Sequence, residues 1–254
     1  MPKGEKLTLK VKIFADGADL GAIKALYADP LIKGFTTNPT LMRAAGITDY
    51  AAFAADVLAV VRDRPVSFEV FADDFGQMIE QGREIGSWAP NVNVKIPIVN
   101  TRNEFTGKVI RALNSDGISV NVTAVFTVGQ VKAALQELKG SAHAYISVFA
   151  GRIADSGIDP VPVVEEAVRV IAARPGTELI WASPREVFNV VQADQTGCQI
   201  ITATSDVLKK LPLLGKDQLK YSLETSQMFH RDAASAGYAI RTSTPTSTRA
   251  RHAI

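Results

Sequence analysis

The feature that most constrains the fold of this chain is a repeated alternation between short β-rich runs and longer helical patterns. Eight runs are rich in β-forming residues, and segments between them carry apolar residues at positions i, i+3, i+4 and i+7. This alternation predicts a parallel sheet with right-handed crossovers. The predicted strands are 11–16, 32–38, 66–72, 92–97, 118–126, 144–150, 178–183 and 199–204.

A doubly wound sheet and a closed barrel both accommodate this pattern. The barrel is favoured because eight strands are predicted and no linker or composition shift divides the 254 residues. We therefore expect an α/β fold, a single (β/α)8 TIM barrel over residues 1–240. Residues 241–254 are rich in Ser, Thr, Pro and Arg and are expected to form a disordered tail. The helical patterns are clearest in 73–88, 127–140 and 161–174.

Charge and cysteine content restrict the expected surroundings and partners. Hydrophobic residues make up 46% and charged residues 21%, as in soluble globular proteins. The net charge of +2 provides no strong attraction to nucleic acid or membranes, so neither is an expected partner. The single cysteine, Cys198, excludes an internal disulfide and is interpreted as a small core residue. With no apolar leader at the N-terminus, these features predict a cytoplasmic protein.

The stretch NVNVKIPIVN, residues 91–100, places a lysine inside a run that otherwise has the pattern of a buried strand. Val94 and Ile96 flank Lys95 in an almost continuous series of β-formers, which is typical of a strand covered on both faces. If the strand is buried, Lys95 points inward, where burial disfavours its charged form. The alternative is that Lys95 lies on an exposed strand face or edge, where lysine is common.

Polar residues at the ends of the other predicted strands favour the inward position. The carboxyl ends of the strands meet at one mouth of a barrel, where active sites form. Serine and threonine there can also be turn or cap residues, but Asp16, Glu69 and Lys95 would each cost free energy if buried without partners. The polar residues are Asp16, Thr37, Asn38, Glu69, Lys95, Asn121, Thr123, Ser147, Ser183, Thr202 and Thr204.

Two arginines follow the late strands and predict an anion site. Arg152 comes just after 144–150, and Arg185 is expected in the first turn of the helix after 178–183. A guanidinium matches phosphate in geometry and charge, and the last strands of such barrels commonly hold a phosphate. The alternative is that Arg152 pairs with Asp155 or Asp159 at the surface.

The residues also bear on the type of chemistry. The chain contains neither a G-x-G-x-x-G motif after a strand nor a G-x-x-x-x-G-K-[ST] motif, so we expect no nucleotide cofactor. Its three histidines do not have the spacing of metal ligands, so we expect no metal site. A buried amine can attack a carbonyl and form a Schiff base, while carboxylates move protons. Together with an anion site, these groups suit a metal-free class I aldol reaction on a phosphorylated ketose.

Residues 11–235 resemble the transaldolase family, in particular its short members, which include fructose-6-phosphate aldolases. The motifs that carry the resemblance are FADGAD, GFTTNPTLM, SFEVFA, VKIP, VNVTAVF, SVFAGRI and ASPREVF. The resemblance implies that Lys95 forms the Schiff base and that Asp16 is the acid/base of C–C cleavage. It also implies that Glu69 and Thr123 hold a catalytic water. The substrate-binding candidates are Thr37, Asn38, Asn121, Ser147, Phe149, Arg152, Ser183 and Arg185.

Four positions distinguish branches of this family. The hydrolytic aldolases typically carry Gln at Glu69 and Tyr at Phe149, and they tend to lack Asn121 and Ser147. The resemblance therefore implies a transaldolase of the pentose phosphate pathway, which moves dihydroxyacetone from sedoheptulose 7-phosphate or fructose 6-phosphate to an aldose phosphate. The alternatives are an aldolase that releases dihydroxyacetone and a non-catalytic sugar-phosphate-binding barrel.

The segment 215–238 predicts one helix more than a barrel needs. Its apolar residues, including Leu219, Leu223 and Phe229, must be buried against another surface. The helix can fold over its own barrel mouth or pack on a neighbouring subunit. Short members of the family use such a helix between subunits, in rings of five that pair into decamers. We therefore expect a homo-oligomer, a pentamer or decamer.

Overall fold

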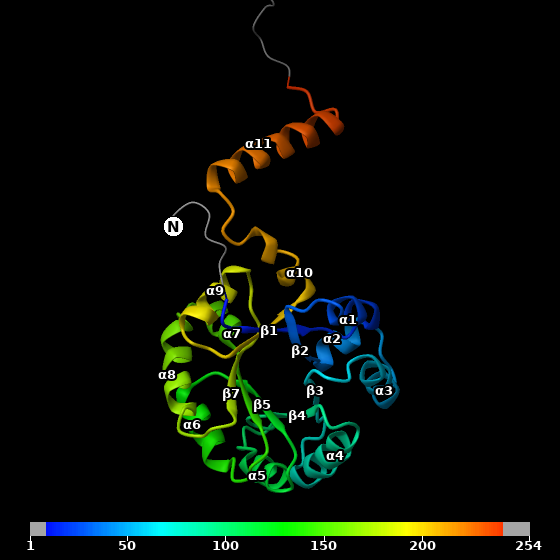
Figure 1. The fold of residues 1–254 in the computed structure, drawn as a ribbon, viewed down its shortest axis with the longest axis vertical. Coiled ribbons are helices and arrows are strands. Elements are labelled where there is room, and N and C mark those ends of the chain that lie inside the picture. The colour runs from blue at the N-terminus through cyan, green and yellow to red at the C-terminus, as the bar shows by residue number, and fades with distance from the viewer. Residues whose placement is uncertain (1–8, 241–254) are drawn as a thin grey trace, which may run out of the picture. The chain divides into compact units, whose positions relative to one another are not determined.

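The computed structural model describes residues 9–240 and has a closed parallel barrel as its central element. Each strand pairs with the next in sequence, and β8 pairs with β1. Figure 1 shows the strands of this unit with helices around them. The predicted TIM barrel is thus confirmed. The strands are β1 (Lys12–Asp16), β2 (Ile32–Thr36), β3 (Val66–Glu69), β4 (Val92–Pro97), β5 (Val120–Val125), β6 (Ala144–Val148), β7 (Thr177–Trp181) and β8 (Ile200–Thr204).

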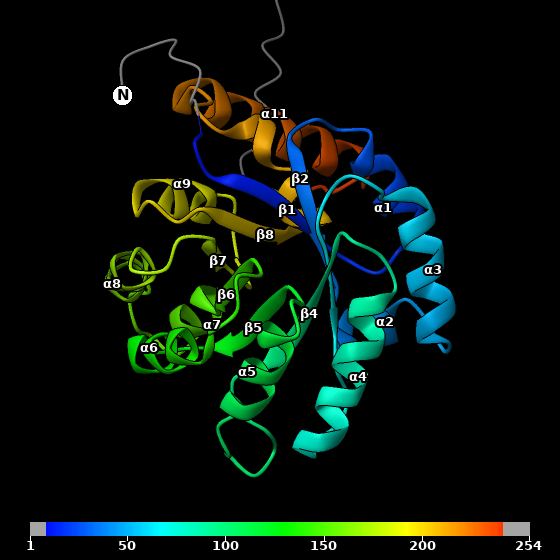
Figure 2. The same cartoon turned by 60° about the horizontal axis from the view of Figure 1, so that its bottom comes forward.

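Helices surround the strands on the outside of the barrel (Figure 2). Many begin at a side-chain cap: Asp19, Asp49, Asp74 and Thr127 each accept a hydrogen bond from the backbone N–H three residues later. The helices of this unit are α1 (Leu20–Tyr27), α2 (Pro39–Ala44), α3 (Tyr50–Val60), α4 (Phe75–Ser87), α5 (Gly107–Ser115), α6 (Val128–Glu137), α7 (Ala150–Asp155), α8 (Val161–Ile171), α9 (Phe188–Gln195), α10 (Ser205–Leu208) and the 3-10 helix η1 (Leu211–Leu213).

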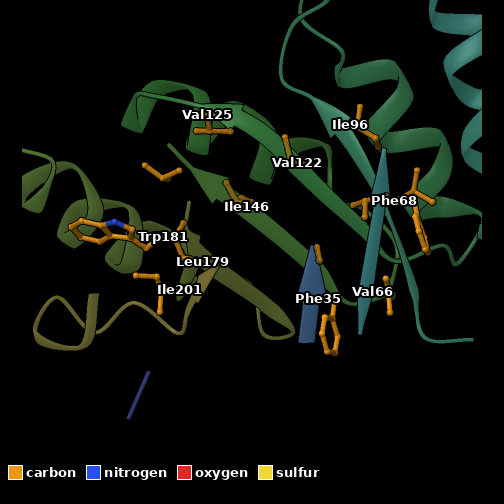
Figure 3. Packing of buried hydrophobic residues seen from close by; sticks show 14 of the residues in the cluster. Phe35, Val66, Phe68, Ile96, Val122, Val125, Ile146, Leu179, Trp181 and Ile201 are labelled. Atoms are coloured by element: carbon orange, nitrogen blue, oxygen red, sulfur yellow. The ribbon is translucent and has the colours of Figure 1, made fainter. Parts of the chain in front are cut away.

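The main hydrophobic core lies between the strands and the helices (Figure 3). It includes Phe68, Ile96 and Trp181, which have no exposed surface. Burial of each such side chain stabilises the fold by about 1.5–3 kcal/mol. This layer explains why the β-rich runs are nearly continuous in apolar residues, since most outward-facing strand residues are buried against the helices.

A second, smaller apolar cluster lies inside the barrel. Phe14, Tyr145, Ile180 and Ile200 are among its members, and all are buried. Side chains alternate along a strand, so Phe14 faces the same way as Asp16, at the end of β1. The apolar cluster is therefore a floor beneath the polar residues of the mouth.

Residues 215–240 belong to a second compact unit, which is separate from the barrel unit. It contains α11 (Gln218–Ser235), which confirms the additional helix predicted within 215–238. Leu219, Leu223 and Phe229 of α11 are exposed. The predicted tail, 241–254, lies outside the described residues. Within residues 9–240, no helix has both the length and the apolar character needed to cross a membrane.

Candidate active site

A cavity of about 400 Å³ opens where the strands of the barrel end, and this volume is in the range of small-molecule sites. Ten of the twelve predicted site residues line it, whereas Thr37 and Asn121 do not. The lining candidates are Asp16, Asn38, Glu69, Lys95, Thr123, Ser147, Phe149, Arg152, Ser183 and Arg185. Tertiary structure thus brings together residues from β1, β3, β4, β5, β6 and α7 and from several loops.

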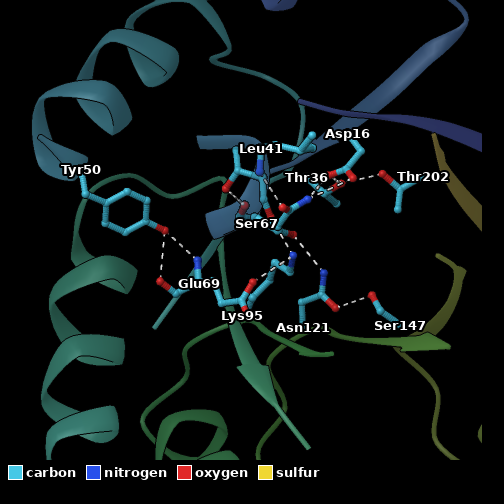
Figure 4. A network of polar contacts seen from close by, with 12 residues as sticks. Asp16, Thr36, Leu41, Tyr50, Ser67, Glu69, Lys95, Asn121, Ser147 and Thr202 are labelled. Carbon is cyan, nitrogen blue, oxygen red and sulfur yellow. Dashed lines mark hydrogen bonds and ion pairs between the residues drawn. The ribbon is translucent and has the colours of Figure 1, made fainter. Parts of the chain in front are cut away.

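Lys95 is buried within the barrel, and only 8% of its side chain is exposed. Its Nζ donates a hydrogen bond to the carbonyl of Thr37 at 2.6 Å and lies 3.2 Å from Oε2 of Glu69 (Figure 4). The ion pair follows from strand register, because Glu69 on β3 lies opposite Lys95 on β4. The alternative placement of Lys95 on an exposed strand face is therefore wrong.

Asp16, at the end of β1, is the second carboxylate of the cavity. The Thr36 hydroxyl donates to its Oδ1 at 2.8 Å, and Nδ2 of Asn38 donates to its Oδ2 at 3.2 Å. Burial raises the pKa of Asp16 above its ordinary value, although the charge of Lys95 and these two donors act in the opposite direction. Asp16 is thus a carboxyl group that two hydrogen-bond donors hold in place and whose pKa burial raises.

The chain beyond β2 explains how Asn38 reaches Asp16. Asn38 is the N-cap of α2, and its Oδ1 accepts a hydrogen bond from the backbone N–H of Leu41 at 2.9 Å. Pro39 follows at the first helical position, where its missing N–H costs nothing. The amide oxygen is therefore used in the cap, and the amide nitrogen remains free to donate to Asp16.

Asn121 and Thr37 lie behind the cavity surface, where their side chains bond to neighbouring residues. The amide of Asn121 donates to Oγ of Ser67 at 3.1 Å and accepts from Oγ of Ser147 at 2.7 Å. The Thr37 hydroxyl donates to the Ser67 carbonyl at 2.9 Å. These groups bond to one another, and Thr37 meets Lys95 through its backbone carbonyl. Both residues support the cavity wall without lining the cavity.

Thr123 lines the cavity next to a local irregularity in β5. Pairing between β5 and β6 shifts between Val122 and Val125, and Ala124 has a φ of 56°. Such a bulge redirects neighbouring side chains. The Thr123 hydroxyl is buried and has no hydrogen-bond partner among residues 9–240. It is therefore free to hold a water or a substrate group.

Arg152 and Ser183 line one side of the cavity, the side where the sequence predicts an anion site. Arg152 lies on α7, and its guanidinium carbon is 5.5 Å from the centroid of the Phe149 ring. The preceding residue, Gly151, packs against the loop after β7, where an added Cβ would come within 1.6 Å of the Ser183 carbonyl oxygen. Only glycine permits this close approach, which brings Arg152 beside Ser183.

Arg185 corrects one prediction. It does not lie in the first turn of a helix, because α9 begins only at Phe188. The Asn189 side chain instead accepts a hydrogen bond from the Arg185 backbone N–H at 2.7 Å and holds this residue in the loop. The surface pair considered for Arg152 is made by Arg185: its Nε lies 3.0 Å from both carboxylate oxygens of Asp155.

Several residues of the site carried little or no signal in the sequence. Thr36 bonds to Asp16 and lies 2.6 Å from the Thr202 hydroxyl, measured between Oγ1 atoms. Its place two residues after Gly34, on the inward face of β2, is a signal that could have identified it. Tyr50 contacts the backbone of Glu69 from a helix outside the barrel, and no local pattern indicates this. Within residues 9–240, no cluster of metal-ligating side chains is present.

Residues 13–248 match the family described as Transaldolase/Fructose-6-phosphate aldolase. The chain belongs to this family. It is 37% identical over 235 residues to a protein named "Probable transaldolase" from Hyphomonas neptunium, a match that covers 91% of this chain and 100% of that protein. A second "Probable transaldolase", from Dehalococcoides mccartyi, is 36% identical over 202 residues, which are 79% of this chain and 90% of that protein.

Among solved structures, this chain shares its fold with a dihydrodipicolinate synthase from Rhodopseudomonas palustris. The TM-score is 0.55 at 12% sequence identity, and the match covers 79% of this chain and 72% of the other. At this identity, the likeness extends to the fold alone.

Proposed function

We propose that this member of the family is a transaldolase. It transfers a dihydroxyacetone unit from a ketose phosphate, such as sedoheptulose 7-phosphate or fructose 6-phosphate, to an aldose phosphate. The observation that supports this proposal most strongly is the buried Lys95 amine beside Glu69, in the cavity that Asp16 also lines. An amine and two carboxyl groups in one enclosed site are the groups that a Schiff-base aldol reaction needs.

The reaction begins with addition of the neutral Lys95 amine to the ketose carbonyl. Glu69, with Oε2 at 3.2 Å from Nζ, accepts the proton that the ammonium loses. Carbinolamine dehydration then forms the protonated imine and releases one water. The unpartnered Thr123 hydroxyl supports a role for Glu69 and Thr123 in holding this water.

Cleavage then breaks the C3–C4 bond of the ketose. Asp16 takes the proton from the C4 hydroxyl, the C4 carbonyl forms, and the bonding electrons pass to the imine to give an enamine. The raised pKa of Asp16 suits a group that must take up this proton and return it to the new alkoxide. The aldose product leaves, an acceptor aldose enters, and the same steps run in reverse.

The anion site provides the grip on phosphorylated substrates. Arg152 lines the cavity, and the structure gives it no carboxylate partner among residues 9–240, so its charge is available to a phosphate. Arg185 also lines the cavity but is paired with Asp155. We infer that Arg152 contributes more than Arg185 to phosphate binding, with Ser183 beside it.

Borohydride reduction and an acceptor assay test this proposal together. Borohydride with fructose 6-phosphate should attach the substrate covalently to Lys95, as found by peptide mass spectrometry. No adduct in active-site peptides would indicate a non-catalytic sugar-phosphate-binding barrel. Turnover should then require an acceptor such as erythrose 4-phosphate. Rapid release of dihydroxyacetone without an acceptor would instead identify a fructose-6-phosphate-type aldolase.

We also propose that the chain forms a homo-oligomer, a pentamer or decamer. Leu219 of α11 is 84% exposed and Phe229 is 63% exposed, and no residue of α11 is buried. An amphipathic helix with its apolar residues exposed needs another surface. Light scattering during size exclusion should give a mass of five or ten chains for the full-length protein. A mass near 27.3 kDa would refute the proposal.

A further inference from the structure

We propose that Tyr50 is a positioning residue that fixes Glu69 by completing the backbone hydrogen bonds at the end of β3. Tyr50 is the first residue of α3, outside the barrel. Its hydroxyl accepts a hydrogen bond from the backbone N–H of Glu69 at 2.7 Å and donates one to the carbonyl of the same residue at 3.1 Å (Figure 4). The Tyr50 side chain thus bonds to both the backbone N–H and the backbone carbonyl of Glu69.

The pairing of the sheet explains why Glu69 needs this partner. The register between β2 and β3 ends with Thr36 opposite Ser67, and the last bond runs from Thr37 N–H to the Ser67 carbonyl. The chain then turns into α2 at Asn38. In a parallel ladder, residues two apart bond to the same neighbour, so Glu69 faces the side that β2 has left. The Tyr50 hydroxyl takes the place of the missing strand.

Packing holds the Tyr50 ring in the orientation that this contact requires. The centroid of the Tyr50 ring lies 6.0 Å from the ring centroid of Phe68, 5.6 Å from that of Trp88 and 4.5 Å from that of Phe71. Burial also raises the pKa of Tyr50, so the phenol keeps the proton that it donates. The hydroxyl is therefore a fixed donor and acceptor at the point where β3 ends.

The consequence for the site comes through the Glu69 side chain. Its Oε2 lies 3.2 Å from Lys95 Nζ, and this separation depends on where the end of β3 is held. The inference rests on the proposed role of Glu69 in moving protons while the imine forms. Removal of the Tyr50 hydroxyl should therefore slow imine formation, while the cavity that recognises the substrate stays intact.

The test is Tyr50→Phe, which keeps the ring and removes both hydrogen bonds. Rapid quenching with borohydride measures how fast the Lys95 adduct forms with fructose 6-phosphate. We expect the rate to fall roughly tenfold to a hundredfold, with KM unchanged, since misplacement of a catalytic group costs rate more than binding. Tyr27→Phe is the matched control, because it removes a hydroxyl on α1 that is bonded to Asp63 in the loop after α3, and its adduct rate should equal that of the wild type.

The outcomes separate this inference from the proposed function. A wild-type enzyme that forms no adduct overturns the proposed function. If the wild type forms the adduct and a folded Tyr50→Phe variant forms it equally fast, only the role of Tyr50 is overturned. The same conclusion follows if a rise in KM accounts for the whole loss of adduct rate in the variant. If Tyr50→Phe does not fold, hydrogen exchange of the Glu69 backbone amide in the wild type is the deciding measurement. Protection equal to that of the Val70 amide supports the role of Tyr50, and rapid exchange overturns it.

Discussion

Replacement of Lys95 with methionine should remove turnover and also destabilise the fold. Methionine retains the volume of the side chain, but Glu69 then has no cationic partner at a site where only 15% of its side chain is exposed. Removal of one partner of a buried ion pair costs about 3–5 kcal/mol. Because Glu69 keeps some contact with solvent, we expect a loss near the lower end, about 3 kcal/mol.

For a chain of this length, a loss of that size lowers Tm by about 6–12 °C. Addition of Glu69→Gln to Lys95→Met removes the unpaired charge and should recover most of the loss. Thermal unfolding followed by circular dichroism measures all three proteins, at one protein concentration because assembly affects Tm. Turnover of both variants should fall by more than about a thousandfold, as expected when a nucleophile is removed.

Two results would refute this reasoning. Equal Tm values for Lys95→Met and the double variant would mean that Glu69 is not stabilised by Lys95. Turnover of Lys95→Met above a thousandth of the wild-type rate would mean that Lys95 is not the nucleophile.

Three further predictions concern Asp16, the arginines and Cys198. Asp16→Asn should lower turnover by roughly 10²–10⁴-fold. It should also be more stable than wild type at pH 7, because a raised folded-state pKa means that ionised Asp16 opposes folding. This advantage should shrink as the pH falls through the raised folded-state pKa and be absent below about 4, where Asp16 is protonated in both states. Arg152→Ala should raise KM for fructose 6-phosphate roughly 10- to 150-fold, the equivalent of about 1.5–3 kcal/mol, but should affect dihydroxyacetone much less. Arg185→Ala should have the smaller effect, since Asp155 already pairs with it. Equal losses with both substrates would contradict the anion site. Burial raises the pKa of Cys198 to about 12, so iodoacetamide at pH 8 should label it only after unfolding, as mass spectrometry of native and denatured protein can show.

Local patterns in the sequence were sufficient to predict the barrel. Each strand and helix has its own periodicity, and eight alternating elements leave few ways to close a sheet. Val94 and Ile96 take the outward positions of β4, and the polar residues at the ends of the other strands indicated that Lys95 faces inward. Recognition of the cavity followed from a general property of parallel barrels, whose strands all end at the same mouth.

Contacts that depend on the exact residue at which a strand ends could not be predicted from local patterns. Thr37 follows the last residue of β2 and supports the cavity wall, while Thr36 reaches Asp16. A shift of one residue changes the face on which a side chain lies, and the end of a strand is not marked by periodicity.

Residue types at regular spacing were enough to predict the fold and most of the chemical groups at the mouth. Which of these groups are paired depends instead on contacts between elements that are distant in the sequence. Arg185 meets Asp155 across 30 residues of sequence, and Tyr50 reaches Glu69 from another element. Such pairs depend on strand register and on the close approach of loops. Neither leaves a trace in the local order of residues, and both determine which charges remain free to act on a substrate.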